Sequence, residues 1–188
     1  MIVHIHMPKS TNQKEKILDA ALELFAKKGY SSTPVSLIAK TAGVSQGLLY
    51  NFFTGKEEVL KEIAVAGFKQ IRLTTEVYKD EHDPRKAIEL HILNVVKELQ
   101  NNTQFWRMMH IIRLQEYVLK TIEPFASEIV GESIQLFTNA FAALGYDNPT
   151  QEAMLLFAQI DGLVALYLFN PQLPIQSLAQ LLINRHTK

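Results

Sequence analysis

Residues 14–60 read KEKILDAALELFAKKGYSSTPVSLIAKTAGVSQGLLYNFFTGKEEVL, and apolar residues recur at helical spacing through this stretch. A first amphipathic helix is predicted over residues 11–28. Ile17, Ala21 and Phe25 lie on its buried stripe, because residues three or four apart share one face of a helix. Gly29 then supplies a stop signal at the carboxyl end. A long helix therefore opens the stretch.

Two short helices are predicted to follow, over residues 34–41 and 46–52. Thr33 is expected to cap the first and Ser45 the second. Gly43 between them permits the positive φ of a tight turn. This arrangement matches the helix-turn-helix plan of DNA-binding proteins. A plain three-helix bundle can contain the same turn and cap, so the spacing alone leaves both interpretations open.

The rest of the chain also reads as helix, because strand-like alternation is scarce. The fold class is therefore all-α, with about nine helices. A three-helix head over residues 9–55 contains the helix-turn-helix, and a larger helical body covers residues 56–188. The six helices predicted after the head span residues 56–78, 84–100, 103–119, 124–144, 149–169 and 175–185.

A gapless series of motif positions runs through the head. It consists of Phe25, Gly29-Tyr30, Thr33, Ile38-Ala39, Ala42-Gly43-Val44-Ser45, Gly47, Leu49-Tyr50, Phe53 and Lys56-Glu57. In these positions the head resembles the DNA-binding domain of the TetR family of transcriptional regulators. The resemblance implies that the body binds a ligand.

Three positions depart from the family pattern. Pro34 stands where a second hydroxyl is common, Leu48 where a small or hydroxylated residue is usual, and Phe52 where His or Tyr is frequent. These departures affect the expected operator sequence rather than the expected binding of DNA.

Hydroxyl groups near helix starts are the first expected DNA contacts. Thr33 and Ser36 at the second helix, and Ser45 at the third, can receive a phosphate together with the free backbone N–H groups there. Lys56 begins the long fourth helix, and its ammonium group is expected to attract one phosphate; an ordinary solvated lysine is the alternative. The resemblance implies that the Tyr50 hydroxyl also reaches the DNA backbone.

Base reading is assigned to the third helix, at Gln46, Gly47, Leu48 and Asn51. Gln can pair with adenine in the major groove, and Leu can touch a thymine methyl group, so some A·T preference is expected. Gly47 lets the helix lie close to the duplex. Core packing is the alternative for Leu48.

One head with few cations should bind DNA weakly, so two heads about one DNA turn apart, ~34–36 Å, are expected. Residues 154–169, MLLFAQIDGLVALYLF, are apolar nearly all round, and such a helix must be covered on more than one side. A homodimer through the last two helices is therefore predicted, completed by Leu178, Leu181, Leu182 and Ile183. A core helix within one subunit is the alternative.

The resemblance further implies a small-molecule effector among the helices of the body. Aromatic and soft side chains there suit an apolar compound or a flat cationic one. The ligand-binding candidates are Phe68, Trp106, Met109, His110, Tyr117, Phe125, Phe137 and Phe141, with His91, Asn94 and Gln159 as further polar candidates. Core packing is the alternative for the aromatic members.

Composition narrows the remaining classes. The 188 residues include no cysteine, so disulfides and thiol catalysis are excluded. No phosphate-binding glycine loop, HExxH or G-x-S-x-G motif is present, so no enzyme activity, cofactor or metal is expected.

No apolar run approaches ~18 residues, so no membrane span is expected and the cytoplasm is the expected location. Met1–His6 is interpreted as an extension before a start at Met7.

Charge is unevenly distributed along the chain. Residues 1–61 hold eight lysines and five acidic residues, although the whole chain has 19 basic and 19 acidic residues.

The predicted function is a ligand-responsive transcriptional repressor that binds a palindromic operator as a homodimer and is released by a small apolar or aromatic effector. The alternatives are a helical ligand-binding or interaction module without sequence-specific DNA binding, and a non-specific architectural DNA binder.

Overall fold

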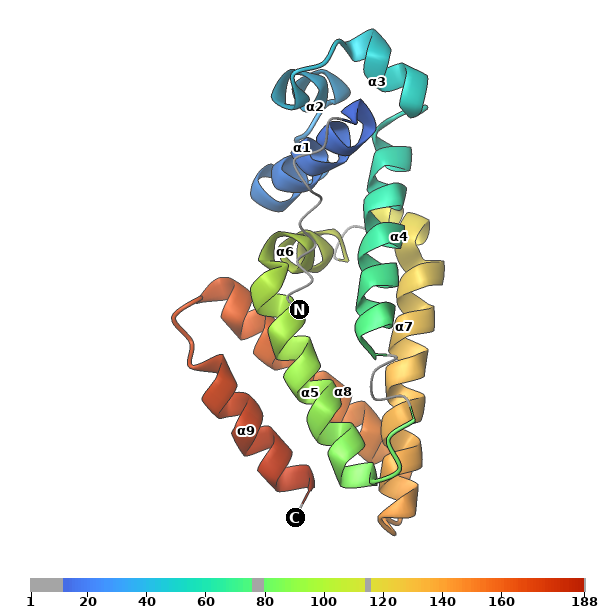
Figure 1. The fold of residues 1–188 in the computed structure, drawn as a ribbon, viewed down its shortest axis with the longest axis vertical. Helices are drawn as coiled ribbons and strands as arrows, with labels where there is room; N and C mark the ends of the chain where they lie inside the picture. Colours follow the sequence, from blue (N-terminus) through green and yellow to red (C-terminus); the bar gives the residue numbers. More distant parts are fainter. Residues whose placement is uncertain (1–11, 76–79, 114–115, 188) are drawn as a thin grey trace. The chain divides into compact units, whose positions relative to one another are not determined.

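The computed structural model describes residues 12–75, 80–113 and 116–187, and every regular element in these ranges is an α-helix (Figure 1). The predicted all-α fold and the count of nine helices are confirmed for these residues. Met1–His6 and Tyr78 lie outside them, as do the side chains of residues 73–75, 117 and 118.

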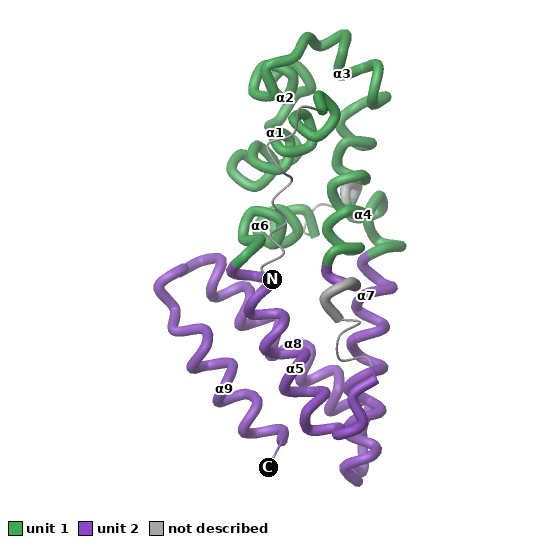
Figure 2. Tube along the Cα trace, in the orientation of Figure 1, with its two compact units in different colours: residues 1–70, 101–125 green, residues 71–100, 126–188 purple. Residues whose placement is uncertain are grey.

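The helices group into two compact units (Figure 2). Unit 1 comprises residues 1–70 and 101–125, and unit 2 comprises residues 71–100 and 126–188. Each unit is therefore assembled from two separate stretches of chain. The division into a DNA-binding head over residues 9–55 and a body over 56–188 is a functional prediction, and it does not coincide with these units.

Unit 1 is built around α1 (Gln13–Lys28), which packs against α2 (Val35–Ala42) and α3 (Gln46–Phe52). The predicted stripe of α1 is buried, since Ile17, Ala21 and Phe25 are inaccessible to solvent. Asn12 caps the helix by accepting a hydrogen bond from the Lys14 N–H group at 3.0 Å. Beyond the carboxyl end, Gly29 adopts a φ of 79°, a conformation that favours glycine.

Three further helices contribute to unit 1: the first part of α4 (Lys56–Thr75), α6 (Thr103–Ile112), which packs against α1, and the first part of α7 (Glu116–Ala143). Phe105 of α6 is buried, and its ring meets the ring of Phe68 edge-on, with centroids 5.8 Å apart. The helix α6 therefore belongs to the same compact unit as the helix-turn-helix, although more than fifty residues separate them in sequence.

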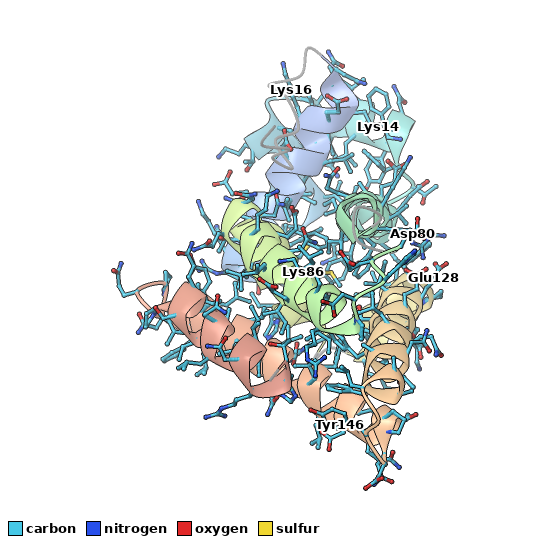
Figure 3. All side chains as sticks on the ribbon, turned by 60° about the horizontal axis from the view of Figure 1, so that its bottom comes forward. Lys14, Lys16, Asp80, Lys86, Glu128 and Tyr146 are labelled. Atoms are coloured by element: carbon cyan, nitrogen blue, oxygen red, sulfur yellow. The ribbon has the colours of Figure 1, made fainter. Side chains whose placement is uncertain are left out.

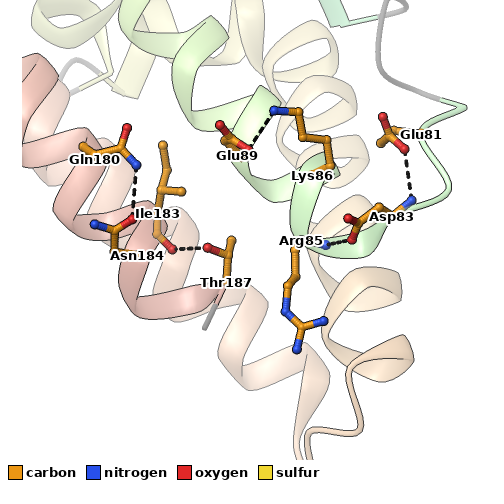
Figure 4. A network of polar contacts seen from close by, with 9 residues as sticks. All are labelled: Glu81, Asp83, Arg85, Lys86, Glu89, Gln180, Ile183, Asn184 and Thr187. Atoms are coloured by element: carbon orange, nitrogen blue, oxygen red, sulfur yellow. Dashed lines mark hydrogen bonds and ion pairs between the residues drawn. The ribbon is translucent and has the colours of Figure 1, made fainter.

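Unit 2 contains α5 (Pro84–Asn101), most of α7 (Glu116–Ala143), α8 (Pro149–Phe169) and α9 (Ile175–His186). Polar contacts secure helix ends, as Figure 4 shows: the Asp83 carboxylate accepts from the Arg85 N–H group at 2.9 Å, and the Thr187 hydroxyl donates to the Ile183 carbonyl at 2.9 Å. The core of this unit includes the fully buried side chains Ile88, Ile92, Phe137, Phe141, Leu156 and Ala179.

The structure corrects the predicted break at Pro124. A helix was expected over residues 103–119 and another from residue 124, but α6 ends at Ile112 and α7 runs through Pro124. Proline has no N–H group, so residue 120 loses one helical hydrogen bond, yet Pro124 lies on an exposed position of α7 where water can replace it. No glycine or proline marks the actual end of α6.

The helix α8 is long and apolar enough to cross a membrane by length and composition, contrary to the expectation that no such segment exists. Only 22% of its most apolar 18-residue window is buried within the chain. An interface helix of a globular protein meets the same criteria, so the finding identifies a helix that lacks a complete cover.

Candidate nucleic-acid interface

The turn between α2 and α3 has the geometry that the helix-turn-helix requires. Gly43 takes a left-handed conformation, with φ 70° and ψ 32°, and its N–H group bonds back to the end of α2. The Ser45 hydroxyl accepts a hydrogen bond from the Leu48 N–H group at 3.1 Å and so caps α3, as predicted. Ile38 and Leu49 are fully buried, which fixes the two helices on α1.

One face of α3 points to solvent. Gln46, Gly47, Tyr50 and Asn51 are exposed, and Leu48 is half-buried. Tyr50 exposes 50% of its surface, whereas burial deep inside the subunit would have excluded it from contact with DNA. Ser36 on α2 is also exposed. The structure thus leaves these six predicted contact residues accessible to a duplex.

Phe52 is 37% exposed at the end of α3. Its ring lies 6.4 Å from that of Phe53, which is buried. Phe52 therefore keeps apolar surface at the end of α3.

Thr33 has a local structural role instead of the predicted ones. The helix α2 begins at Val35 with Pro34 at its cap position and without a side-chain cap bond. The Thr33 side chain is fully buried, and its hydroxyl donates to the Gly29 carbonyl at 2.8 Å. A hydroxyl held in this way is not presented to a phosphate, because its hydrogen is already used inside the protein.

Lys56 also differs from both interpretations of the sequence. Its Nζ atom donates to the Tyr30 carbonyl at 2.9 Å and to the Ser31 carbonyl at 3.5 Å. It lies 4.3 Å from the centroid of the Tyr30 ring, within the range of a cation–π interaction. Partial burial lowers the pKa of Lys56. The ammonium group is thus bound to the loop after α1.

Other cations of the head differ in how they are held. Lys14 pairs with Glu62 at 2.8 Å and lies 5.5 Å from the Phe53 ring, so it joins α1 to α4. Lys27 pairs with Glu23, one turn away on α1. Lys16 and Lys40 are exposed, and Figure 3 labels Lys14 and Lys16 near the amino end of α1. The lysines of the head therefore serve packing as well as surface charge.

The effector candidates are divided between the two compact units. Phe68, Trp106, Met109, His110 and Phe125 belong to unit 1, whereas Phe137 and Phe141 belong to unit 2. The side chain of Tyr117 lies outside the described part of the chain. Phe137 and Phe141 are completely buried, as core residues are. The indole Nε1 of Trp106 is buried and has no hydrogen-bond partner among the residues that the structure describes, which suits a group that faces a ligand.

The burial of Glu98 on α5 was not predicted from the sequence. Glu98 and His91 are both buried and are seven positions apart, so they lie on the same helix face. The His91 ring meets the Phe137 ring with centroids 4.8 Å apart, and burial lowers the pKa of His91 to about 4. A charged residue at a core position of the apolar period was the available signal for Glu98.

The predicted dimer helices expose apolar side chains. Leu155, Leu166 and Phe169 of α8 are 59%, 54% and 90% exposed, and Gly162 between them is open enough for a Cβ to meet no atom within 4 Å. On α9, Leu181 is exposed, but Leu182 and Ile183 are buried within the chain and serve its core. The apolar face available for association is therefore mainly that of α8.

Comparisons with known proteins agree with this geometry. Residues 17–63 match the profile of the bacterial regulatory proteins of the tetR family. The HTH-type transcriptional regulator YuxN of Bacillus subtilis (strain 168) is 28% identical over 186 residues, covering 81% of this chain and 63% of that relative. The chain thus spans less than two thirds of that relative's length.

Solved structures share the whole fold. A transcriptional regulator from Rhodococcus sp. Rha1 has a TM-score of 0.78 at 18% identity, with 93% of this chain and 94% of that chain covered. The transcriptional regulator FadR from Bacillus subtilis, solved in complex with stearoyl-CoA, has a TM-score of 0.75 at 22% identity, with 93% and 97% covered.

A helix-turn-helix followed by a larger helical body is the fold that these solved structures share with the chain. The predicted resemblance is confirmed by these comparisons: residues 17–63 match the amino-terminal segment of the TetR family of transcriptional regulators.

Proposed function

We propose that the protein is a transcriptional repressor that binds a palindromic operator as a homodimer and leaves it when a small apolar effector binds. The observation that carries this proposal is the solvent-facing surface of α3, on a helix-turn-helix that Ile38 and Leu49 hold in place from its buried side. The exposed apolar residues of α8 offer a surface through which two copies of the chain can associate. The cytoplasm is the location in which such a repressor would act.

The proposed DNA contacts are Ser36, Ser45, Gln46, Gly47, Leu48, Tyr50 and Asn51, all accessible in the structure. Gln46 is assigned to an adenine edge and Leu48 to a thymine methyl group, since these are the pairings that the two side chains favour in the major groove. Ser36, Ser45 and Tyr50 are assigned to phosphates, which position the head without reading sequence.

The homodimer is proposed to form through α8, with Leu181 of α9 at its edge. Leu155, Gly162, Leu166 and Phe169 follow one another at helical spacing along the exposed face. An exposed apolar stripe of this kind costs free energy unless another surface covers it. A second copy related by a two-fold axis covers it with the same stripe and brings two heads to one duplex.

The effector is proposed to present an apolar chain to the body, and a long-chain acyl-CoA is the first compound to test. The structurally similar FadR was solved with stearoyl-CoA, and the body of this chain offers buried aromatic side chains and the buried indole N–H of Trp106. The effector acts by a population shift, because a ligand moves an equilibrium only through its different affinity for the two forms.

Selection of duplex DNA from a random pool tests the proposal. The expected result is enrichment of an inverted repeat that is lost when stearoyl-CoA is added. The Gln46→Ala variant should lose the enrichment, whereas Gln180→Ala, an exposed substitution on α9, should keep it. Recovery of no preferred sequence, with affinity set by salt alone, would instead favour the non-specific or non-DNA-binding alternatives.

A further inference from the structure

We propose that Lys56 is a positioning residue that anchors the loop between α1 and α2 to the start of α4, and that it is not a phosphate ligand. The proposal rests on the proposed function, because the loop that Lys56 anchors leads into the helix-turn-helix. It assigns to an internal contact a cation for which the sequence predicts either a phosphate contact or ordinary solvation.

Local hydrogen bonds shape the anchored loop. After Gly29, the Thr33 hydroxyl donates to the Gly29 carbonyl at 2.8 Å and the Thr33 N–H group to the Tyr30 carbonyl at 3.2 Å. Both bonds lie within the loop. The Lys56 ammonium group adds bonds from another element, at 2.9 Å to Tyr30 and 3.5 Å to Ser31. It therefore ties the loop to α4.

The helix dipole explains why these carbonyl groups are needed. The amino end of α4 carries a partial positive charge, so an ammonium group in its first turn is unfavourable by itself. Two carbonyl oxygens and the face of the Tyr30 ring offset that cost, because all three present negative charge to Nζ. Tyr30 is itself buried and packs on Phe25, with ring centroids 5.2 Å apart. Lys56 thus binds a fixed part of the head.

The loop that Lys56 anchors affects DNA binding through the position of α3. The loop over residues 29–34 delivers the chain into α2, and α2 together with the Gly43 turn places α3. A loop released from α4 would leave the exposed face of α3 less well fixed. Operator binding needs two such faces in register, whereas non-specific binding to phosphates does not. Loss of Lys56 should therefore reduce specific affinity more than non-specific affinity.

The test compares Lys56→Met and Lys56→Arg with Lys61→Met, which removes the same charge from an exposed position of the same helix. Affinity for the selected operator and for a random duplex is measured over a series of KCl concentrations, on protein shown to be folded by circular dichroism. Hydrogen exchange of the peptide that covers residues 29–34 is measured without DNA. Lys56→Gln replaces Lys56→Met if the methionine variant does not fold.

The proposal expects Lys56→Met to lower operator affinity about tenfold at every salt concentration, since a bond to a charged group is worth about that factor. The salt dependence should equal that of Lys61→Met, exchange over residues 29–34 should accelerate, and Lys56→Arg should restore both. A salt slope smaller by about 0.9 per lysine, with equal losses on operator and random DNA, would overturn it. Unchanged exchange would overturn it as well. If the wild-type protein selects no operator, the proposed function fails, and the exchange measurement still decides the role of Lys56.

Discussion

Gly67 of α4 and Phe105 of α6 lie so close that a Cβ atom at residue 67 would overlap the Phe105 ring. Phe105 is 2% exposed and cannot turn into solvent without leaving its place beside α1 and Phe68. The absence of a side chain at residue 67 therefore determines how near α4 and α6 approach within unit 1.

Replacement of Gly67 by alanine should destabilise the protein. Alanine in a helix interior ordinarily gains up to about 1 kcal/mol over glycine, but overpacking of a filled core costs about 1–3 kcal/mol. The expected net loss is about 1–2 kcal/mol in the free energy of unfolding, measured by urea denaturation. The emission of Trp106, the one tryptophan of the chain, should also shift, because Trp106 neighbours Phe105.

Gly131 of α7 is the matched control for this substitution. A Cβ there meets no atom within 4 Å, and the position is exposed. Gly131→Ala should therefore stabilise the protein by about 0.5–1 kcal/mol. Equal effects of the two substitutions would show that the contact with Phe105 imposes no constraint.

Much of the fold follows from local pattern. The stripe of α1 with its Gly29 stop, and the Gly43 turn with its Ser45 cap, repeat short-range rules that operate within a few residues. For the same reason the exposed face of α3 was foreseeable: Leu49 and Phe53 account for its buried side and leave Gln46, Tyr50 and Asn51 outside.

Where the structure differs from the predictions made from sequence, the cause is often a contact between residues that are distant in the chain. Lys56 and Tyr30 are 26 positions apart, and no spacing rule joins them. The placement of Phe105 against Gly67 likewise arises from the packing of α6 into unit 1. Pro124 is a strong local stop signal, but α7 continues because the proline lies on its exposed side.

Contact between Leu48 and a thymine methyl group can be measured in the operator itself. Replacement of the contacted thymine by deoxyuridine removes one methyl group, worth about 0.8 kcal/mol or about a fourfold loss of affinity. In the Leu48→Ala variant the same DNA change should have almost no effect, because the partner of the methyl group is gone. Fluorescence anisotropy with four protein and DNA combinations gives the coupling. Independent, additive losses would assign Leu48 to core packing.

Association through α8 predicts a specific effect of charge at its exposed face. Leu166→Glu should yield a folded monomer, because the carboxylate would be buried without a partner in the dimer. Operator affinity should fall about a hundredfold or more, since each head then binds one half-site alone. Light scattering and circular dichroism report mass and fold. Leu93→Glu, at an exposed leucine of α5, should remain dimeric; a monomeric wild-type protein would remove α8 from this role.

Protonation of His91 should limit stability in acid. Burial lowers the pKa of His91 from 6.5 to about 4, so the unfolded chain binds the proton more tightly than the folded protein between these values. The stabilising contribution is therefore complete above pH 6.5 and is lost as the pH falls toward 4. The full difference is about 3 kcal/mol, an upper bound for one group. Denaturation curves at pH 7.5, 6.5, 5.5 and 4.5 measure it.

The His91→Gln variant separates this effect from the titration of carboxylates. Glutamine cannot become charged, so the variant should lose less stability than the wild-type protein between pH 6.5 and 4.5, whatever its stability at pH 7.5. His82→Gln, at an exposed histidine before α5, should follow the wild-type curve. The buried ring meets Phe137 edge-on and has little solvent to stabilise a positive charge, so its protonation in the folded protein should be unfavourable. Parallel curves for the wild-type protein and His91→Gln would contradict this, because they would mean that the ring accepts its proton without a cost in stability.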